Sequence, residues 1–369
     1  MKVLVVSSYL LPHCGGVEVL VDQEIQLLAR QGHSVVVIGS NAGEGESPIY
    51  GADVEVIRIA AWNGLEQRFQ VPWLVFSPRL APLLLRYIRW CDVVHVHGFL
   101  SVGSLVALIF ARYLNKRSIL TEHIGLAWYS SRLKWLVQWL AIWLIGIFCV
   151  RMAKRSFAYH ERVVALLQKL AGPRGQIYYL PNPLQRSFLR PPNEQERLDA
   201  RQALGWPKDR PTVLFVGRLV IRKGIDLLLQ AKNSEFDLVF CGPGDSTLLG
   251  DLQNKGITYL QPRSRRELVS LYHAADVLAV PSRSEGGLVL VAQEALLCGL
   301  PVLVGDDPGL TRYRSCAGLH FCALKPEAIQ RGISMILRRH GRTFERQGEL
   351  LPLERFLPDE GEWVKQLLR

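Results

Sequence analysis

The chain has 369 residues, which is too long for one ordinary hydrophobic core, so we expect two domains. Its formal charge of +11, from 44 basic and 33 acidic residues, favours an anionic partner: a nucleic acid, an anionic membrane surface or a phosphorylated substrate. The seven cysteines have no metal-ligand spacing and form no Cys-x-x-Cys pair, which argues against a metal site and favours free thiols in a reducing compartment.

The N-terminal run MKVLVVSSYLLP is short and passes directly into a Gly-Gly loop without a small-residue cleavage site, so we expect a buried strand rather than a signal peptide. Short Val, Leu and Ile runs then alternate with longer helical patterns, which is typical of parallel sheets flanked by helices. The expected strands of the first half lie at 2–7, 34–38, 54–59, 92–97, 118–121, 156–159 and 177–180. The expected helices lie at 17–30, 78–90, 100–114, 133–153 and 161–170.

A segment rich in Pro, Arg and Glu at 185–211 follows a tight LPNPL turn and predicts the boundary between the domains. A second alternating set follows it, with expected strands at 212–216, 237–241, 257–260, 277–280, 301–304 and 318–321. The pattern predicts an α/β protein with two Rossmann-like, doubly wound domains. Ligands of such sheets bind at the carboxyl ends of the strands, so we expect the active site in a cleft between the domains.

Two segments of the second half carry the strongest motifs. The first, 216–224, reads VGRLVIRKG and sets Arg218 and Lys223 in a loop between a strand and a helix. The second, 281–301, reads PSRSEGGLVLVAQEALLCGLP and places Glu285 in a Gly-rich loop and Glu294 on the following helix. A guanidinium and an ammonium can hold a diphosphate, and carboxylates accept hydrogen bonds from sugar hydroxyls. The pattern therefore predicts a site for a nucleotide-sugar.

Together these segments resemble the donor site of glycosyltransferase family 4, whose members are retaining enzymes of the GT-B fold. The resemblance implies that Arg218 and Lys223 bind the donor diphosphate, that Glu294 binds the ribose and that Glu285 lies beside the donor sugar. The family has seven residues between these two glutamates and this chain has eight, so the loop must absorb one extra residue. Further donor contacts are expected from the backbone amides of the loop before the helix, at Gly287, Leu288 and Val289.

Three loops of the first half also match family elements. The PHCGGVE loop offers Gly15 and Gly16, where a backbone without side chains can approach the donor phosphate or the acceptor. The DVVHVHG strand puts His97 at a carboxyl end, whereas His95 is expected in the core. The LTEHIG segment carries His123, which resembles a family histidine near the reacting sugar and can orient the acceptor.

The resemblance also assigns the domains: an acceptor-binding domain at 1–184, a linker at 185–211, a nucleotide-sugar domain at 212–350 and a C-terminal helix at 351–369 that returns to the first domain. One later segment departs from the family. GDDPGLTRYR follows a strand at a place where relatives often carry a Gly-Gly pair and a glutamate, so contacts there are not carried over.

An apolar segment at 128–155 suggests a membrane partner. It contains 16 successive residues without charge, Trp135 to Val150, with a tryptophan at every fourth position from 135 to 143 and cations at both ends. This run is short for a membrane span, and a tryptophan stripe flanked by cations suits a helix at an anionic lipid surface. The alternative is a core helix with some exposed aromatic side chains. We expect peripheral attachment to the cytoplasmic face of the cell membrane.

The expected activity is transfer of a sugar from a UDP- or GDP-linked donor to a hydroxyl acceptor, with retention and with neither a metal nor another cofactor. A role in cell-surface glycan, lipopolysaccharide or glycolipid synthesis would suit a membrane-attached enzyme. Other possibilities are an epimerase or phosphorylase of the same architecture, or a non-catalytic scaffold that binds nucleotide-sugars and membranes. A nucleic-acid binder fits the charge alone, because the basic residues are dispersed.

Overall fold

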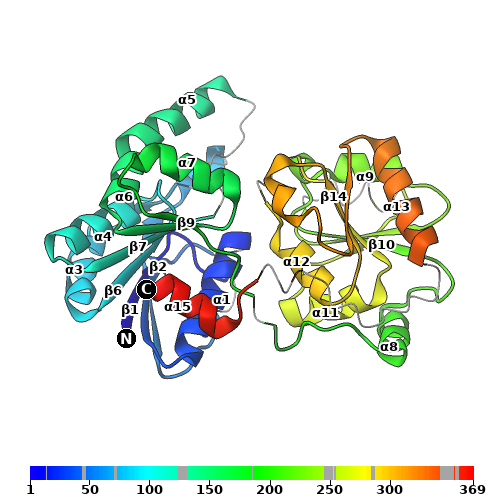
Figure 1. Cartoon of the computed structure of the whole chain (residues 1–369), viewed down its shortest axis with the longest axis horizontal. Helices are drawn as coiled ribbons and strands as arrows, with labels where there is room; N and C mark the ends of the chain where they lie inside the picture. Colours follow the sequence, from blue (N-terminus) through cyan, green and yellow to red (C-terminus); the bar gives the residue numbers. More distant parts are fainter. Residues whose placement is uncertain are drawn as a thin grey trace. The chain divides into compact units, whose positions relative to one another are not determined.

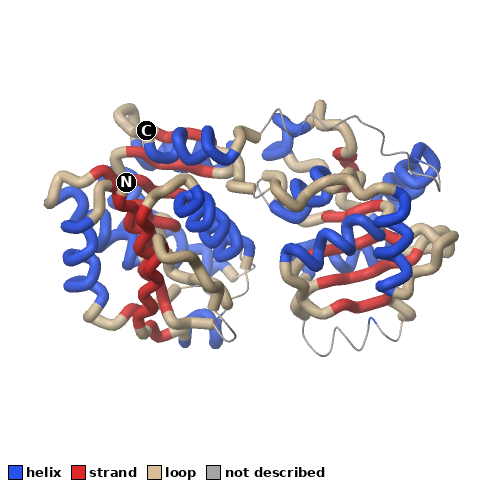
Figure 2. The backbone as a smooth tube through the Cα atoms, turned by 90° about the horizontal axis from the view of Figure 1, so that it is seen from below, coloured by secondary structure: helices blue, strands red, loops and turns tan. Residues whose placement is uncertain are grey.

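The computed structural model describes residues 1–13, 15–43, 47–69, 73–123, 131–184, 186–244, 252, 255–283, 287–340, 353 and 357–369. The chain divides into two compact units, one formed by Met1–Leu184 with Pro358–Arg369 and the other by Gln185–Leu357. Each unit has a parallel sheet with helices packed on it (Figures 1 and 2). This is the α/β, two-domain architecture that the alternating pattern predicts.

The first unit contains a seven-stranded parallel sheet in the order β3-β2-β1-β6-β7-β8-β9. Its strands are β1 (Lys2–Val6), β2 (Ser34–Ser40), β3 (Val54–Ile59), β6 (Val93–His97), β7 (Arg117–Glu122), β8 (Arg155–Ala158) and β9 (Ile177–Tyr179). The central strands are buried on both faces, which explains their continuous runs of Val, Leu and Ile. The order reverses between β1 and β6, and doubly wound sheets bind ligands at such a switch point.

Helices cover both faces of this sheet. They are α1 (Gly16–Arg30), α2 (Gly64–Phe69), α3 (Leu80–Trp90), α4 (Val102–Tyr113), α5 (Arg132–Ala141), α6 (Ile147–Met152), α7 (Glu161–Ala171) and α15 (Glu360–Leu368). Side chains of α3, α4, α6 and α7 share one core with the strands. The C-terminal helix α15 lies beside α1 (Figure 1), and Trp363 donates a hydrogen bond from Nε1 to the Pro181 carbonyl at 2.7 Å.

A short antiparallel hairpin, β4 (Ala61–Trp62) with β5 (Val75–Phe76), is an addition that the sequence pattern does not predict. Each of its strands has two residues, and such a length is too short for an alternating pattern to be recognised. The Trp62 side chain is exposed on it.

The apolar segment forms one helical run, in which a π-helical turn η1 (Ile142–Gly146) joins α5 to α6. Residues Arg132–Met152 make a helix of 21 residues that is long and apolar enough to cross a membrane, by length and composition alone, and a third of its apolar window is buried. Only Ala141 is buried along α5, whereas α6 contributes Ile147, Cys149 and Val150 to the core. Trp135, Trp139 and Trp143 are 53%, 44% and 53% exposed. Residues 128–130 lie outside the described part.

The second unit has a six-stranded parallel sheet in the order β12-β11-β10-β13-β14-β15. Its strands are β10 (Thr212–Val216), β11 (Asp237–Cys241), β12 (Thr258–Leu260), β13 (Val277–Val280), β14 (Val302–Gly305) and β15 (Leu319–Cys322). Its helices are α8 (Glu194–Leu204), α9 (Ile225–Ala231), α11 (Arg265–Ala274), α12 (Leu290–Leu297) and α13 (Pro326–His340), with 3-10 turns η2 (Ile221–Lys223) and η3 (Pro308–Tyr313).

The segment 185–211, expected as a linker, contains helix α8 and belongs to the second unit. Asn193 and Glu196 form a capping box at its start. On its inner face the Arg201 guanidinium is 2% exposed and donates to the carbonyl of Ala274 and to the carboxylate of Asp276. The polar composition of this segment suggests a linker, but the segment forms a mostly solvated helix. That helix has one buried arginine, whose guanidinium is fully paired.

Candidate functional site

Three loops of the second unit meet at the carboxyl ends of its central strands. Gly217 donates from its backbone N–H to the Cys241 carbonyl at 2.9 Å, and Leu219 donates to the Pro243 carbonyl at 2.8 Å. Gly242 has φ of +140°, and a Cβ atom there would lie 2.2 Å from the Gly217 carbonyl oxygen. The GPG turn after β11 is therefore packed directly under the loop that carries Arg218.

The two motifs of the second half come together at this edge of the sheet. Gly224, which follows Lys223, is left-handed with φ of +77°, and a Cβ atom there would lie 2.1 Å from the Pro281 carbonyl oxygen. Only glycine allows this approach. Arg218 is exposed and forms no ion pair with another described residue, while Lys223 is partly buried at the end of η2.

Arg283 ties the two motifs together, and the sequence analysis did not single it out. It donates from Nη1 and Nη2 to the two carboxylate oxygens of Asp226 at 2.7 and 2.6 Å, and its backbone N–H donates to the Arg222 carbonyl at 3.0 Å. The hydrogen bonds from Arg283 hold the pKa of Asp226 below its usual value. Asp226 lies two residues after the Lys-Gly pair, so its charge could be noticed in the sequence. Its pairing with Arg283 could not, because the two residues are 57 positions apart.

Glu294, expected at the ribose, is buried at 2% exposure on α12. One carboxylate oxygen accepts a hydrogen bond from Arg265 Nε at 2.7 Å and the other accepts one from the Tyr272 hydroxyl at 3.0 Å. Burial raises the pKa of Glu294, although Arg265 and Tyr272 act against that shift. Within its own unit the carboxylate is thus fixed by two protein donors, neither of which sequence reasoning identified.

The loop before α12 carries the other expected donor contacts. Gly287 and Leu288 are buried and Val289 is partly buried, and the side chain of Val289, the N-cap residue, makes no capping hydrogen bond to the first turn of α12. Instead, Gln293 Nε2 donates to the Leu288 carbonyl at 2.7 Å and holds the loop against the helix. The first backbone amides of α12 can therefore serve an anion. Glu285 lies outside the described residues.

In the first unit, Gly15 and Gly16 form the turn into α1. Gly15 is the N-cap in an extended conformation, and a Cβ atom there would lie 2.2 Å from the carboxylate of Glu18. That carboxylate contacts His13 Nδ1 at 2.9 Å and raises the pKa of His13. A negative side chain thus already occupies the start of α1, where the helix dipole favours it.

His97 is the last residue of β6 and His123 follows the neighbouring strand β7, and the structure brings the two side chains together. His97 Nδ1 lies 2.9 Å from His123 Nε2, and both rings are almost completely buried. Their loops are fixed by Glu122, whose carboxylate accepts hydrogen bonds from the backbone N–H groups of Phe99 and His123. The edge of the Tyr159 ring packs on His123. In the described part of the first unit, His97 is therefore a buried neighbour of His123 and not an exposed group.

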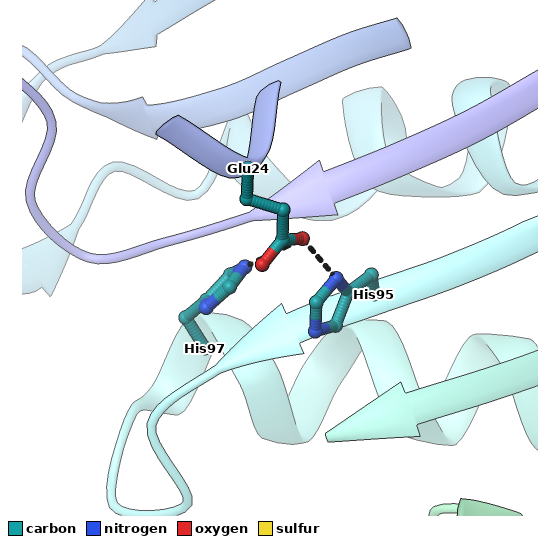
Figure 3. Close-up of side chains that lie close together, drawn as sticks. All are labelled: Glu24, His95 and His97. Carbon is teal, nitrogen blue, oxygen red and sulfur yellow. Dashed lines mark ion pairs between the residues drawn. The ribbon is translucent and has the colours of Figure 1, made fainter. Parts of the chain in front are cut away.

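Glu24 is the residue of this cluster that the sequence analysis missed. It projects from α1 toward both histidines of β6 (Figure 3), with one oxygen 2.5 Å from His95 Nδ1 and 3.5 Å from His97 Nε2. His95 Nε2 lies 2.7 Å from the Thr121 hydroxyl. The sequence did contain a signal for Glu24. It is a glutamate on the helix face that buries the apolar residues Val21, Ile25 and Leu28.

The same three side chains have the composition of a metal site. Glu24, His95 and His97 offer ligand atoms that lie within 4.8 Å of one another. However, two ligands of one tetrahedral zinc ion with bonds near 2.0–2.1 Å are separated by roughly 3.3 Å. The contact between Glu24 and His95 is 2.5 Å, which is the distance of a close ion pair and is too short for two ligands of one ion. The geometry of these three side chains fits an ion-paired cluster better than a metal site.

Known proteins similar to this chain agree with the two-unit architecture. Residues 14–187 match the model of Glycosyltransferase Family 4, and residues 196–342 match that of Glycosyl transferases group 1. A D-inositol 3-phosphate glycosyltransferase of Xylanimonas cellulosilytica is 28% identical over 329 residues, covering 80% of this chain and 76% of that protein. One of Mycolicibacterium smegmatis is 41% identical over 124 residues, covering 30% of this chain and 28% of that protein.

Solved structures show the same fold. HepE of Anabaena in complex with UDP has a TM-score of 0.75 at 16% identity and covers 100% of this chain and 98% of its own. Sucrose-phosphate synthase of Thermosynechococcus elongatus has a TM-score of 0.73 at 21% identity, with coverages of 99% and 94%. The two family matches, the relatives and the fold show that this chain belongs to the group 1, family 4 glycosyltransferases of the GT-B fold, enzymes that use nucleotide-sugar donors.

Proposed function

We propose that this glycosyltransferase moves a hexosyl group from a UDP- or GDP-linked sugar to a hydroxyl acceptor with retention of the anomeric configuration. The observation that carries the proposal is the packing of the Arg218–Lys223 loop against the Pro281 segment at the carboxyl ends of β10 and β13. Structures similar to this one were solved with UDP and UDP-glucose, which favours UDP as the first donor to test.

Arg218 and Lys223 would act on the leaving group. As the bond between the sugar and the diphosphate breaks, negative charge grows on the diphosphate, and two fixed cations stabilise it without a metal ion. The N-terminus of α12, which the Val289 side chain does not cap, has Gly287 and Leu288 before it and supports binding of the same phosphates through backbone amides. No cofactor is required for this chemistry.

Glu294 would bind the ribose and Glu285 would lie beside the transferred sugar. The Glu294 carboxylate holds Arg265 and Tyr272, but each carboxylate oxygen can accept a second hydrogen bond, so a ribose hydroxyl can be added without displacing either partner. His123, with His97 behind it, would orient the reacting sugar or the acceptor hydroxyl, and the Gly15–Gly16 turn would approach the donor phosphate or the acceptor.

We further propose a glycan or lipid-linked acceptor, used in cell-surface glycan, lipopolysaccharide or glycolipid synthesis at the cytoplasmic face of the cell membrane. The exposed tryptophans of α5 and η1 support peripheral attachment, because indole rings favour the lipid headgroup region. Arg132 and Lys134 precede the tryptophans. At the other end Arg155 is used within the fold, with its guanidinium over the rings of Phe157 and Tyr178.

The test is a donor screen with the full chain. Purified protein is incubated with UDP-, GDP- and ADP-sugars and either membrane lipid extract or D-inositol 3-phosphate, and release of the nucleoside diphosphate is followed. We expect acceptor-dependent release with one donor. Lys223→Ala should lower this release about 100-fold or more, because it removes a charge that stabilises the transition state. Arg222→Ala, which removes the neighbouring cation, should retain most of it.

Each part of the proposal has its own contrary outcome. Equal losses in Lys223→Ala and Arg222→Ala would remove the specific role of Lys223. A product with inverted anomeric configuration, measured by NMR, would contradict retention. Release with D-inositol 3-phosphate but not with lipid extract would replace the proposed acceptor by the one for which the relatives are named.

Membrane attachment is tested with vesicles. Wild-type protein should sediment with vesicles that contain anionic lipid and return to solution at alkaline pH, as a peripheral protein does. Replacement of Trp135, Trp139 and Trp143 by Ser should weaken sedimentation while thermal stability changes little, since the three side chains are about half exposed. Retention in the membrane after alkaline extraction would instead indicate that Arg132–Met152 spans it.

A further inference from the structure

Four buried side chains form a continuous chain of contacts from α1 to the end of β7. Glu24 lies between His95 and His97 (Figure 3), and His97 in turn contacts His123. All four are at most 5% exposed. The rings of His97 and His123 are stacked, with centroids 5.1 Å apart. Polar groups at this depth must match donors with acceptors, since an unmatched pair is costly in a medium of low dielectric.

The charge of each group follows from its surroundings. Burial alone would keep Glu24 protonated, but His95 and His97 beside it hold its pKa below the usual value, so Glu24 is an anion at neutral pH. Burial lowers the pKa of His97 and, with His97 beside it, lowers that of His123 further. Both rings are therefore neutral, and each carries one proton on one of its two nitrogens.

The anion decides which nitrogens carry these protons. A carboxylate is only an acceptor, so His97 turns an N–H at Nε2 toward Glu24; at 3.5 Å this contact is electrostatic rather than a short hydrogen bond. His97 Nδ1 is then an unprotonated acceptor, 2.9 Å from His123 Nε2. His123 must donate from Nε2–H, which leaves its own Nδ1 unprotonated. That atom is buried and has no hydrogen-bond partner among the described residues.

We infer that Glu24 is a positioning residue that acts through His97 to hold His123 in the tautomer with Nε2–H and an unprotonated Nδ1. If His123 acts as the proposed function has it, this Nδ1 accepts a hydrogen bond from a hydroxyl of the sugar or acceptor. The opposite tautomer would direct two lone pairs or two protons at each other within the cluster. The inference about the ring stands on the contacts and on the charge of Glu24, whereas the hydroxyl partner rests on the proposed function.

The direct test is nitrogen NMR of the imidazole rings in the full chain. Protein labelled with ¹⁵N in its histidines is assigned with His97→Gln and His123→Asn variants, and long-range proton–nitrogen spectra report which ring nitrogen is protonated. We expect wild-type His123 to be neutral and protonated at Nε2. Protonation at Nδ1 in the wild-type protein would overturn the inference without any need for a Glu24 variant.

Glu24→Gln then tests the origin of the tautomer. Glutamine has almost the same size but offers either a carbonyl or an amide, so nothing forces a proton onto His97 Nε2, and His123 should lose its single tautomer. Glu18→Gln is the matched control, because Glu18 is a second buried glutamate of α1 with its own histidine. It should alter His13 alone. Glu24→Asp, which keeps the charge, should restore the wild-type tautomer, and an unchanged His123 in Glu24→Gln would contradict the inference.

Activity separates a failure of this inference from a failure of the proposed function. If both hold, Glu24→Gln should lower kcat about 10–100-fold with little change in the donor KM, comparable to loss of an outer partner of an oriented histidine. In a His123→Ala background the same change should cost almost nothing further, since both act through one ring. If His123 has the expected tautomer but the protein releases no nucleoside diphosphate, the proposed function is contradicted and the inference about the ring stands.

A metal ion in the cluster would give the opposite spectrum. If zinc bound His97 at Nε2, the proton of His97 would move to Nδ1, and His123 would have to accept at Nε2 and carry its proton on Nδ1. Zinc retained at one equivalent through dialysis, together with a His123 ring protonated at Nδ1, would therefore contradict the inference. Purified protein with the expected tautomer and with zinc removed by dialysis supports it.

Discussion

Glu24 of the first unit and Glu294 of the second are both almost completely buried on a helix, but the two carboxylates have different partners. Glu294 of the second unit is held by Arg265, a permanent cation, and by the Tyr272 hydroxyl. Glu24 of the first unit is held by His95 and His97, whose protons can move between nitrogens. Accordingly the pKa of Glu294 is raised by its burial, whereas the histidines lower that of Glu24 against its burial.

The difference separates two tasks. An arginine partner fixes the position of a carboxylate in one charge state and suits a structural or ribose-binding role. A neutral histidine carries its proton on one of two ring nitrogens, so histidine partners can set the tautomer of a neighbouring ring. They therefore suit the orientation of a reacting group. The cations proposed to bind the diphosphate, Arg218 and Lys223, differ from both buried glutamates. They lie in a loop of the second unit, and Arg218 is exposed there.

The largest expected effect comes from His123. His123→Ala should lower kcat about 10²–10⁴-fold with a small change in the donor KM, because a positioned hydrogen-bonding imidazole contributes by that amount. The measurement is steady-state nucleoside diphosphate release with the donor found in the screen. His33→Ala, a change at a more exposed histidine of the same unit, is the control. Equal losses in the two variants would show that His123 has no special role.

Arg218 should affect activity and not stability. Arg218→Ala should lower kcat/KM for the donor about 10²-fold through loss of charge stabilisation, while the free energy of unfolding stays within about 0.5 kcal/mol, since the side chain is exposed and has no described ion-pair partner. Urea unfolding and donor kinetics on one protein sample check both statements. A variant that loses stability as well would place Arg218 among the residues that hold the fold together.

Removal of each glutamate should test the two kinds of partner. Glu294→Ala leaves Arg265 as an uncompensated, largely buried cation and should lower the stability of the second unit by about 3 kcal/mol. Glu24→Ala leaves no permanent cation behind and should cost the first unit only about 1–2 kcal/mol. Asp306→Ala, which removes an exposed ion pair with Arg314, should change stability by less than about 1 kcal/mol. A larger loss for Glu24 than for Glu294 would contradict the comparison.

The two buried clusters should also contribute to stability in acid in opposite directions. His97 and His123 have lowered pKa values, so the unfolded chain binds more protons below the usual value of 6.5, and the first unit loses stability as the pH falls through 6.5. Each proton contributes about 1.4 kcal/mol per pH unit. His13, whose pKa is raised, opposes part of this loss. Glu294, with a raised pKa, binds its proton more tightly when folded and contributes stability as the pH falls toward 4.5. Carboxylates of the same unit with lowered pKa values, such as Asp226, contribute in the opposite sense.

Urea unfolding at about pH 7, 6 and 5, with pulsed hydrogen exchange at one fixed labelling pH, measures each unit separately. His123→Asn should reduce the slope of the first unit by about one proton. A slope of the first unit that is unchanged in His123→Asn would show that the buried histidines do not contribute in the expected way.

Much of the fold could be predicted because strands of a parallel sheet are buried on both faces and appear as short Val, Leu and Ile runs. Every expected strand of both sheets is present, with ends shifted by at most two residues. The hairpin β4–β5 was missed because it is too short for a pattern, and α8 was taken for a linker because only Arg201 shows that one of its faces is buried.

The candidate site was predictable only where a motif lies in one continuous segment. Arg218 and Lys223 share one loop, and His97 and His123 lie at the ends of neighbouring strands. The partners that define the chemistry were not predictable, since Glu24, Arg265 and Tyr272 come from helices at other places in the chain. Distant pairs such as Arg283 with Asp226 depend on tertiary packing, which no local pattern contains.

The central claim is that the second unit binds the nucleoside diphosphate at the carboxyl ends of β10, β11 and β13, and hydrogen exchange in the presence of UDP, GDP or ADP tests it most directly. With one of these ligands we expect slower exchange at 217–224, at 242–244 and at 287–294, and loss of this protection in Lys223→Ala. Protection confined to other segments, or unchanged in Lys223→Ala, would contradict the assignment.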